Sequence, residues 1–153
     1  MITREVDYAI RTVLALSKRG ASPAANTVAV ATAELAKETG IPFRFLRRIV
    51  RKLVEGEILT SQRGNGGGVQ LTKSPEAVSL LAVITAVDSR STKLNLCTIH
   101  SDNCPNSGVC RVHHELFNLQ NILEARLDQI TMPQLLQSAS EESHHLHEAT
   151  SGQ

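Results

Sequence analysis

The sequence contains no tryptophan and few other aromatic residues, with three Phe and one Tyr among 153 residues. Leu, Val, Ile and Ala must therefore fill the interior, and a hydrophobic content of 41% is enough for the core of one ordinary domain. No run of about eighteen apolar residues is present, so we expect no membrane-spanning segment. Charges at Arg4, Glu5 and Asp7 exclude an ordinary signal peptide, and we expect a cytoplasmic protein.

A charge excess is also absent from the chain as a whole, because the net charge is only +1. A nucleic-acid partner must therefore be argued from where the charges lie. Between Ile41 and Arg63, six Lys or Arg residues stand against two acidic ones, which is a local basic excess. No nucleophile paired with a base and no pair of carboxylates stands out, so we expect no enzyme activity.

Cysteine is rare, but the three cysteines, Cys97, Cys104 and Cys110, lie close together. His113 follows them, which gives the spacing Cys-x6-Cys-x5-Cys-x2-His. Three thiols cannot all pair within one chain, so metal binding or redox sensing is favoured over a disulfide framework. Thiolates select zinc, cuprous copper or iron-sulfur clusters. A closed zinc site that includes His113 and a metal-free thiol switch are the alternatives.

The first third of the chain predicts a helix-turn-helix. Apolar residues recur at helical spacing from residue 2 to residue 18. A short helix is predicted over residues 33–39, with Thr32 as its N-cap and Gly40 ending it. Pro42 suits the first turn of a third helix that runs to about Glu55. Two short helices joined by a tight glycine turn are typical of this motif.

The third helix has two different faces. The predicted apolar stripe comprises Phe45, Leu46, Ile49, Val50 and Leu53, and the predicted basic face comprises Arg44, Arg47, Arg48 and Arg51. A basic face is either a solvated helix surface or a surface that contacts DNA.

A predicted hairpin follows this helix, with strands at 58–61 and 69–71 and a glycine-rich loop that contains Arg63 and Gly64. A helix-turn-helix followed by such a hairpin is a winged helix, whose recognition helix enters the major groove while Arg63 can reach the minor groove. The alternative, a phosphate-binding nucleotide loop, lacks the Walker spacing.

We predict a winged-helix domain at 1–88, which ends in a buried helix over residues 78–87. The rest of the chain divides into three parts. Residues 89–110 are a connector and the cysteine loop, residues 111–136 a long helix and a short terminal helix, and residues 137–153 a polar tail that we expect to be disordered. The apolar stripe of the long helix packs either on its own domain or on a second copy. We predict a mainly α fold: a winged helix-turn-helix with a small β-hairpin wing and a long C-terminal dimerisation helix.

Over about residues 1–136 the sequence resembles the bacterial winged-helix iron-sulfur regulators, the family that includes IscR, NsrR and RirA. The resemblance rests on Asp7-Tyr8-Ala9-Ile10, Glu34-Leu35-Ala36, Thr39-Gly40-Ile41, the wing from Arg63 to Gly68, the three cysteines, and Ile130-Thr131 before Leu135-Leu136. It implies a homodimer that binds promoter DNA, through Arg44, Arg47, Arg48, Arg51, Arg63 and Gly64 here, according to the state of an iron-sulfur cluster.

The resemblance also implies the cluster ligands, which are Cys97, Cys104, Cys110 and a variable fourth group. In the favoured NsrR-like case the fourth ligand is Asp7 from the partner subunit and the cluster is 4Fe-4S. In the IscR-like case it is His113 and the cluster is 2Fe-2S. The expected function is a repressor that responds to nitric oxide, redox or iron status, and an electron-transfer protein that does not bind DNA is the alternative class.

Overall fold

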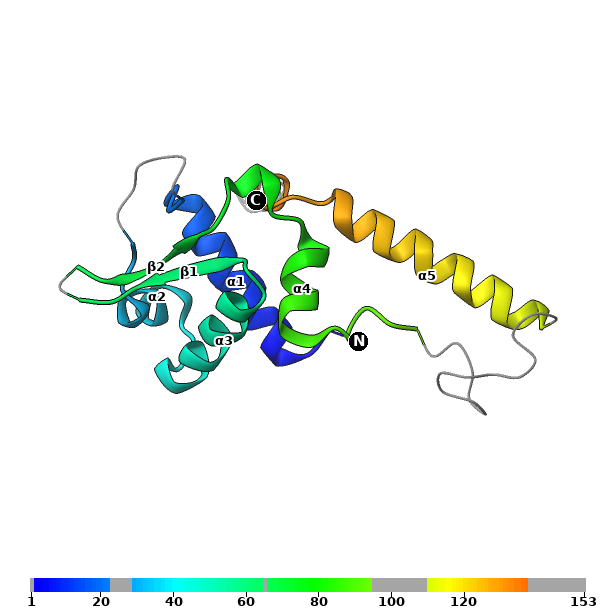
Figure 1. Cartoon of the computed structure of the whole chain (residues 1–153), viewed down its shortest axis with the longest axis horizontal. Coiled ribbons are helices and arrows are strands. Elements are labelled where there is room, and N and C mark those ends of the chain that lie inside the picture. The colour runs from blue at the N-terminus through cyan, green and yellow to red at the C-terminus, as the bar shows by residue number, and fades with distance from the viewer. Residues whose placement is uncertain (1, 23–28, 65, 95–109, 138–153) are drawn as a thin grey trace, which may run out of the picture.

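The computed structural model describes residues 2–22, 29–64, 66–94 and 110–137. Helices α1 to α4 and a hairpin form a body from which a long helix, α5, extends to one side (Figure 1). The cysteine segment, residues 95–109, lies outside the described residues; Leu94 before it bonds to Gln120 of α5, and Cys110 after it is the N-cap of α5. The predicted mainly helical fold with a two-stranded hairpin is confirmed.

The first helix, α1 (Arg4–Lys18), supplies one wall of the core. Thr3 caps it, because the side-chain oxygen accepts a hydrogen bond from the backbone N–H of Val6 at 3.4 Å. Val6, Val13 and Leu16 are fully buried on one face, as the helical spacing predicts. Helix α1 contacts α2, α3 and α4, so it holds the helix-turn-helix and α4 together.

Helices α2 (Thr32–Thr39) and α3 (Phe43–Glu55) form the predicted helix-turn-helix. Gly40 joins them with a left-handed φ of 68°, a conformation that favours glycine. Two capping predictions are wrong by one residue. Ala31, with no side-chain hydrogen bond, occupies the N-cap position that we predicted for Thr32, and Pro42 is the N-cap of α3 instead of lying in its first turn.

The wing consists of β1 (Leu59–Gln62) and β2 (Gly68–Leu71), which pair antiparallel with Leu59 opposite Leu71. Val30 adds a bridge on the other side of β2, with two 2.9 Å hydrogen bonds to Val69. The chain passes so close to Gly68 that a Cβ there would lie 2.3 Å from the Val30 carbonyl oxygen. Glycine at this position therefore allows the segment before α2 to hold the base of the wing.

The helix α4 (Leu80–Asp88) follows a short 3-10 turn, η2 (Pro75–Ala77), and packs against α1 and α3. The end of α5 (Arg111–Gln129) is attached to the start of α4. The Ser79 hydroxyl donates to Asp128 at 2.8 Å, and the Leu80 N–H donates to the Ile130 carbonyl at 2.8 Å. Residues 132–137 are again helical, and Met132 is fully buried.

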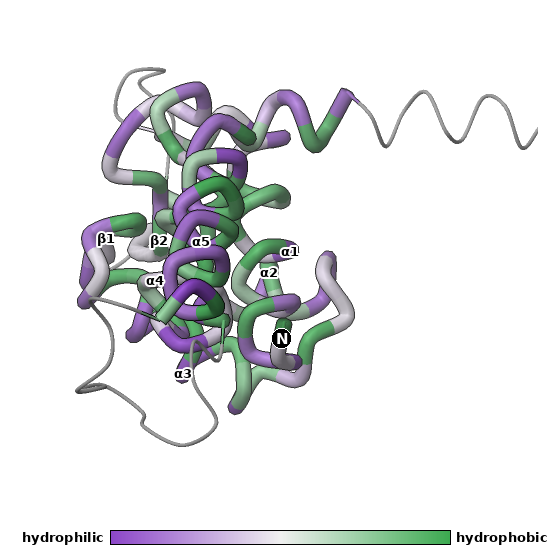
Figure 2. Tube along the Cα trace, turned by 90° about the vertical axis from the view of Figure 1, so that its right-hand side faces the viewer, coloured by the Kyte–Doolittle hydropathy of each residue, from purple (hydrophilic) through white to green (hydrophobic). Residues whose placement is uncertain are grey.

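Most of α5 is exposed in the single chain. Val112, Leu119 and Ile122 are 66%, 52% and 65% exposed, and hydrophobic residues recur from turn to turn in a view along the helix (Figure 2). Gln120 is the buried exception, because its amide accepts from the Leu94 N–H at 2.7 Å and donates to the Thr92 carbonyl at 3.0 Å. The connector before the cysteine segment is thus attached to the middle of α5.

Among the residues that the structure describes, no helix is both long and apolar enough to cross a membrane.

Candidate nucleic-acid interface and metal-ligand segment

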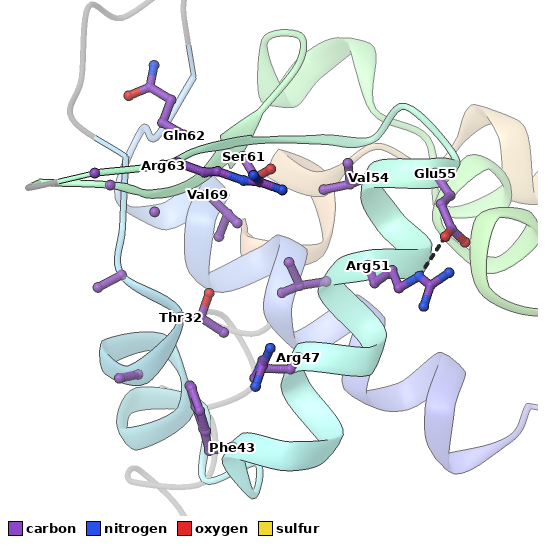
Figure 3. Close-up of a pocket in the computed structure, with 16 residues that line it drawn as sticks. Thr32, Phe43, Arg47, Arg51, Val54, Glu55, Ser61, Gln62, Arg63 and Val69 are labelled. Atoms are coloured by element: carbon purple, nitrogen blue, oxygen red, sulfur yellow. Dashed lines mark hydrogen bonds and ion pairs between the residues drawn. The ribbon is translucent and has the colours of Figure 1, made fainter.

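An open groove of about 810 Å³ lies between α3 and the wing (Figure 3). Helix α3 contributes Phe43, Arg47 and Arg51 to its lining, and the wing contributes Arg63 and Gly64. The fold therefore brings together four of the six predicted DNA-contacting residues. Their cationic side chains come from a helix and a hairpin that are separate in sequence, so the groove is basic on both walls.

The wing side of this groove depends on glycine. Gly64 has a φ of 107° and Gly66 a φ of 79°, both in the left-handed region that side chains with a Cβ rarely adopt. These turns place Arg63 at the exposed end of β1, beside the groove that α3 lines. Asn65, between the two glycines, lies outside the described residues.

Inside the groove, the two arginines of α3 have different partners. The Arg47 guanidinium lies 5.9 Å from the centre of the Phe43 ring, a distance at which a cation is attracted to the ring face. Arg51 donates to Glu55 at 2.8 Å, and this hydrogen bond raises the pKa of the Arg51 side chain. The Arg51 and Glu55 side chains are both exposed, so Arg51 can exchange Glu55 for another anion at little cost.

The other two predicted arginines, Arg44 and Arg48, line a separate hollow of about 280 Å³ together with Phe45. Arg48 is paired with Glu5 on α1, and its guanidinium carbon lies 5.7 Å from the centre of the Phe45 ring. Glu5 also accepts from Lys52 at 2.6 Å. The structure therefore holds one predicted DNA contact, Arg48, in an ion pair that crosses from α3 to α1.

Phe45 differs from its predicted place in the apolar stripe of α3. Leu46, Ile49, Val50 and Leu53 are buried as predicted, but Phe45 is 50% exposed and Phe43 is 46% exposed. Helical spacing places Phe45 at the margin of the stripe, where it can lie on either side of the boundary. Both rings belong to the exposed surface of α3.

The metal-ligand segment is described only at its end. Cys97 and Cys104 lie outside the described residues, whereas Cys110 is the N-cap residue of α5 and is a half-buried free thiol. His113 follows in the first turn, with its ring stacked on Phe117 at 6.4 Å between ring centres. Its Nδ1 atom is buried and has no hydrogen-bond partner in the part of the chain that the structure describes.

Asp7 lies in the first half of α1 and pairs with Arg11 at 3.1 Å, with 44% of its side chain exposed. The start of α5 points away from the body of the molecule that contains α1 (Figure 1). Asp7 and Cys110 of one chain are therefore apart, and residues 2–22, 29–64, 66–94 and 110–137 contain no group of three metal-ligating side chains.

The helix-turn-helix, the wing and the basic groove between them define a winged-helix DNA-binding protein. The sequence matches the Rrf2 family, described as iron-dependent transcriptional regulators, over residues 2–138. The chain belongs to this family, whose members are transcriptional regulators and not enzymes.

Among curated relatives, the chain is 28% identical over 138 residues to the HTH-type transcriptional repressor NsrR of Streptomyces coelicolor, covering 88% of this chain and 87% of the relative. It is 30% identical over 107 residues to the HTH-type transcriptional regulator IscR of Yersinia pseudotuberculosis, covering 70% of this chain and 64% of the relative.

Solved structures share the fold. CymR of B. subtilis, titled the global cysteine regulator, aligns with a TM-score of 0.66 at 17% identity, covering 88% of this chain and 95% of that one. T. potens IscR aligns with a TM-score of 0.64 at 18% identity, covering 93% of this chain and 90% of that one.

Proposed function

We propose that this transcriptional regulator is a cytoplasmic homodimeric repressor that binds promoter DNA and responds to nitric oxide, redox or iron status through an iron-sulfur cluster. The observation that carries the DNA-binding part is the groove that Arg47 and Arg51 of α3 line together with Arg63 of the wing. Cationic side chains on a recognition helix and on a wing can engage the major and the minor groove of one duplex at the same time.

The proposed docking places the start of α3 in the major groove. Arg44, Arg47, Arg48 and Arg51 lie on its exposed side, where arginine can bind guanine through two hydrogen bonds or contact phosphate. Arg63 and Gly64 lie on the wing, where Arg63 can enter a narrow minor groove and Gly64 allows close approach to the backbone. The matched relative from Streptomyces coelicolor is named a repressor, which supports repression here.

The proposed dimer uses the apolar face of α5. Val112, Leu119 and Leu123 recur on one side of the helix and are 66%, 52% and 36% exposed in the single chain. Exposed apolar surface at helical spacing over several turns is typical of a helix that packs against a partner. A second copy of the same helix is self-complementary across a two-fold axis, which makes it the natural partner.

The proposed cluster ligands are Cys97, Cys104 and Cys110 with Asp7 of the partner subunit, for a 4Fe-4S cluster. The donor set fits, because cysteine thiolates are the usual ligands of such clusters and three of the four positions would be filled by them. The exposed ion pair with Arg11 leaves Asp7 available at small cost, and the separation of α1 from the start of α5 favours Asp7 of the partner subunit over Asp7 of the same chain. The bound cluster would supply a redox-active group with one readily exchanged oxygen ligand.

A second candidate for the fourth ligand is His113, with a 2Fe-2S cluster. The observation in its favour is the buried Nδ1 atom, which has no hydrogen-bond partner among the described residues. A buried polar atom without a partner is costly, and a ligand bond would satisfy it. Both cluster proposals have two alternatives, which the test below distinguishes from them. The same thiolates could bind zinc, or they could act as a metal-free thiol switch.

The chain's own contacts suggest how the cysteine segment would influence α3. Cys110 is the N-cap of α5, so whatever holds its thiolate also holds the first turn of that helix. Asp128 near the other end of α5 accepts from Ser79 at the start of α4, and Lys52 of α3 donates to the Val87 carbonyl at the end of α4 at 3.1 Å. A shift of α5 would therefore reach α3 through α4.

The cluster proposal is tested with protein purified without oxygen. We expect a brown protein with sulfur-to-iron charge-transfer absorption, whereas zinc-bound or metal-free protein is colourless. Asp7→Ala should change the absorption, the stability and the reactivity of the bound group toward nitric oxide, while His113→Ala should leave them unchanged. The reverse result would assign the fourth position to His113, and colourless anaerobic protein would contradict both cluster proposals.

The DNA-binding proposal is tested separately by mobility shift at moderate salt, with promoter fragments in competition with random duplex. Preferential binding of particular fragments is expected. Equal affinity for every fragment would contradict a sequence-specific regulator, whatever the state of the cysteines.

A further inference from the structure

The first turn of α3 exposes two phenylalanines that flank Arg44 in the sequence and precede a buried leucine. Phe43 and Phe45 are 46% and 50% exposed, while Leu46 is fully buried. Single exposed apolar residues are common on protein surfaces, but these are two of the three phenylalanines of the chain, in one turn of one helix. Both lie on the part of a recognition helix that approaches base edges.

The rings border the basic surface of α3. With about 100° of rotation per residue, Phe43 and Phe45 lie at the two edges of the exposed arc. The residues between them on that arc are Arg44, Arg47, Arg48, Arg51 and Lys52, together with Val54 and Glu55 in the last turn of the helix. A surface made of arginines with an aromatic ring at each edge is suited to a polyanion that also presents apolar groups.

Each ring also has an arginine beside it. The guanidinium carbon of Arg47 lies 5.9 Å from the centre of the Phe43 ring, and that of Arg48 lies 5.7 Å from the centre of the Phe45 ring. A cation near an aromatic face is attracted to it, so each ring and its arginine restrict each other's position. The two phenyl groups are therefore partly preorganised for contact.

We propose that Phe43 and Phe45 are specificity-determining residues that contact the C5-methyl groups of thymines in the major groove. A phenyl ring has no hydrogen-bonding atom, so it cannot read the donors and acceptors of base edges. The thymine methyl is the apolar group that a base pair presents in the major groove. With arginines that can read guanine beside each ring, the expected half-site contains thymines next to guanines. This inference rests on the proposed DNA binding and is independent of the cluster.

The test is uracil interference on selected DNA, because uracil differs from thymine only by the missing methyl group. Duplexes that bind the full-length protein are selected from a random pool and resynthesised with uracil at random thymine positions. We expect uracil at one or two thymines of each half-site to weaken binding about fourfold, the effect of one methyl group lost from an apolar contact. Uracil at thymines outside the protected region is the internal control.

Substitutions then assign each methyl contact to a ring. Phe43→Ala and Phe45→Ala should each bind the thymine and the uracil duplex equally well at one position and retain the difference at the other. Phe117→Ala is the matched control, because Phe117 is 48% exposed but lies on α5, and it should retain the full uracil effect. The readout is the ratio of two affinities for one protein, so a general loss of affinity does not imitate the result.

Specific binding in which uracil is tolerated at every protected thymine would overturn this inference and leave the proposed function intact. A uracil effect that survives in both phenylalanine variants would also overturn it, because other groups would then contact the methyls. Failure to select any preferred duplex would overturn the proposed function and this inference together.

Discussion

The Glu5 carboxylate on α1 accepts a hydrogen bond from the Lys52 ammonium on α3, with Oε2 and Nζ 2.6 Å apart. The other oxygen of the same carboxylate pairs with Arg48. One acidic residue at the start of α1 thus holds two cations of the recognition helix, one of which belongs to the proposed DNA-contacting set. If Arg48 contacts DNA as proposed, Glu5 competes with DNA for it.

Glu5→Gln should strengthen binding to duplex DNA of any sequence, because Arg48 is released to contact phosphate. The salt dependence of log affinity should steepen by about one. Fluorescence anisotropy at several salt concentrations measures both quantities. Glu76→Gln is the control, since it removes the same charge from an exposed residue of η2. An affinity and a salt slope that change equally in the two variants would contradict a local effect.

The cost of Glu5→Gln to folding should be small. The side chains of Glu5, Arg48 and Lys52 are 31%, 55% and 34% exposed, and ion pairs at such positions contribute about 0 to 1 kcal/mol. Denaturant unfolding should confirm that any change in DNA affinity is not a loss of folded protein.

Arg63→Ala should weaken operator binding, and the loss should be larger when the bases under the wing are A·T-rich. A narrow minor groove attracts an inserted arginine, and A·T tracts have the narrowest groove. Affinities for operators with A·T-rich and G·C-rich flanks give the comparison. Arg90→Ala, at a side chain that is 92% exposed next to α4, should leave both affinities unchanged. The same loss for both flanks would show that Arg63 contacts only phosphate.

Gly56→Ala should destabilise the fold by about 1 to 3 kcal/mol, the usual effect of overpacking. Gly56 has an ordinary φ of −86°, but a Cβ there would lie 2.5 Å from the Cβ of Ala86 on α4. The substitution therefore tests the packing of α3 on α4 without backbone strain. Urea unfolding of Gly56→Ala, Ala86→Gly and the double variant gives the measurement.

In that series, the double variant should be more stable than the sum of the single effects predicts, because Ala86→Gly removes the clashing methyl. Additive effects would show that the end of α3 and α4 are not in the described contact.

Leu119→Glu should convert the proposed dimer to a monomer, because it places a charge on the exposed apolar face of α5. Asn121→Glu is the matched control, because Asn121 lies on the opposite side of the same helix and is also exposed. Light scattering after size-exclusion chromatography gives the mass of each variant. Monomeric wild-type protein, or dimers for both variants, would contradict the proposed interface.

The sequence predicts the elements of the winged helix well because each has a local signal. Gly40 marks the turn, Leu46 and Leu53 recur at helical spacing, and the glycines after Arg63 mark the wing. The errors at Thr32 and Pro42 are shifts of one residue at helix ends, where neighbouring positions are nearly equivalent in energy.

The contacts that sequence analysis missed are those between distant residues. Glu5 is 43 residues from Arg48 and 47 from Lys52, and no local pattern relates acids and bases so far apart. Phe45 was misplaced because hydrophobic spacing identifies the centre of an apolar stripe better than its edge. The positions of Cys97 and Cys104 stay predictions, since both lie outside the described residues.

We propose that the state of the cysteine segment controls operator affinity. The most direct measurement titrates one anaerobic preparation against its selected operator by anisotropy, before and after complete loss of the iron-sulfur absorption on exposure to nitric oxide, at fixed salt and protein concentration. We expect a loss of specific affinity with little change in binding to random duplex, because the basic surface of α3 is retained while its placement changes. Unchanged operator affinity after complete loss of the absorption would contradict it.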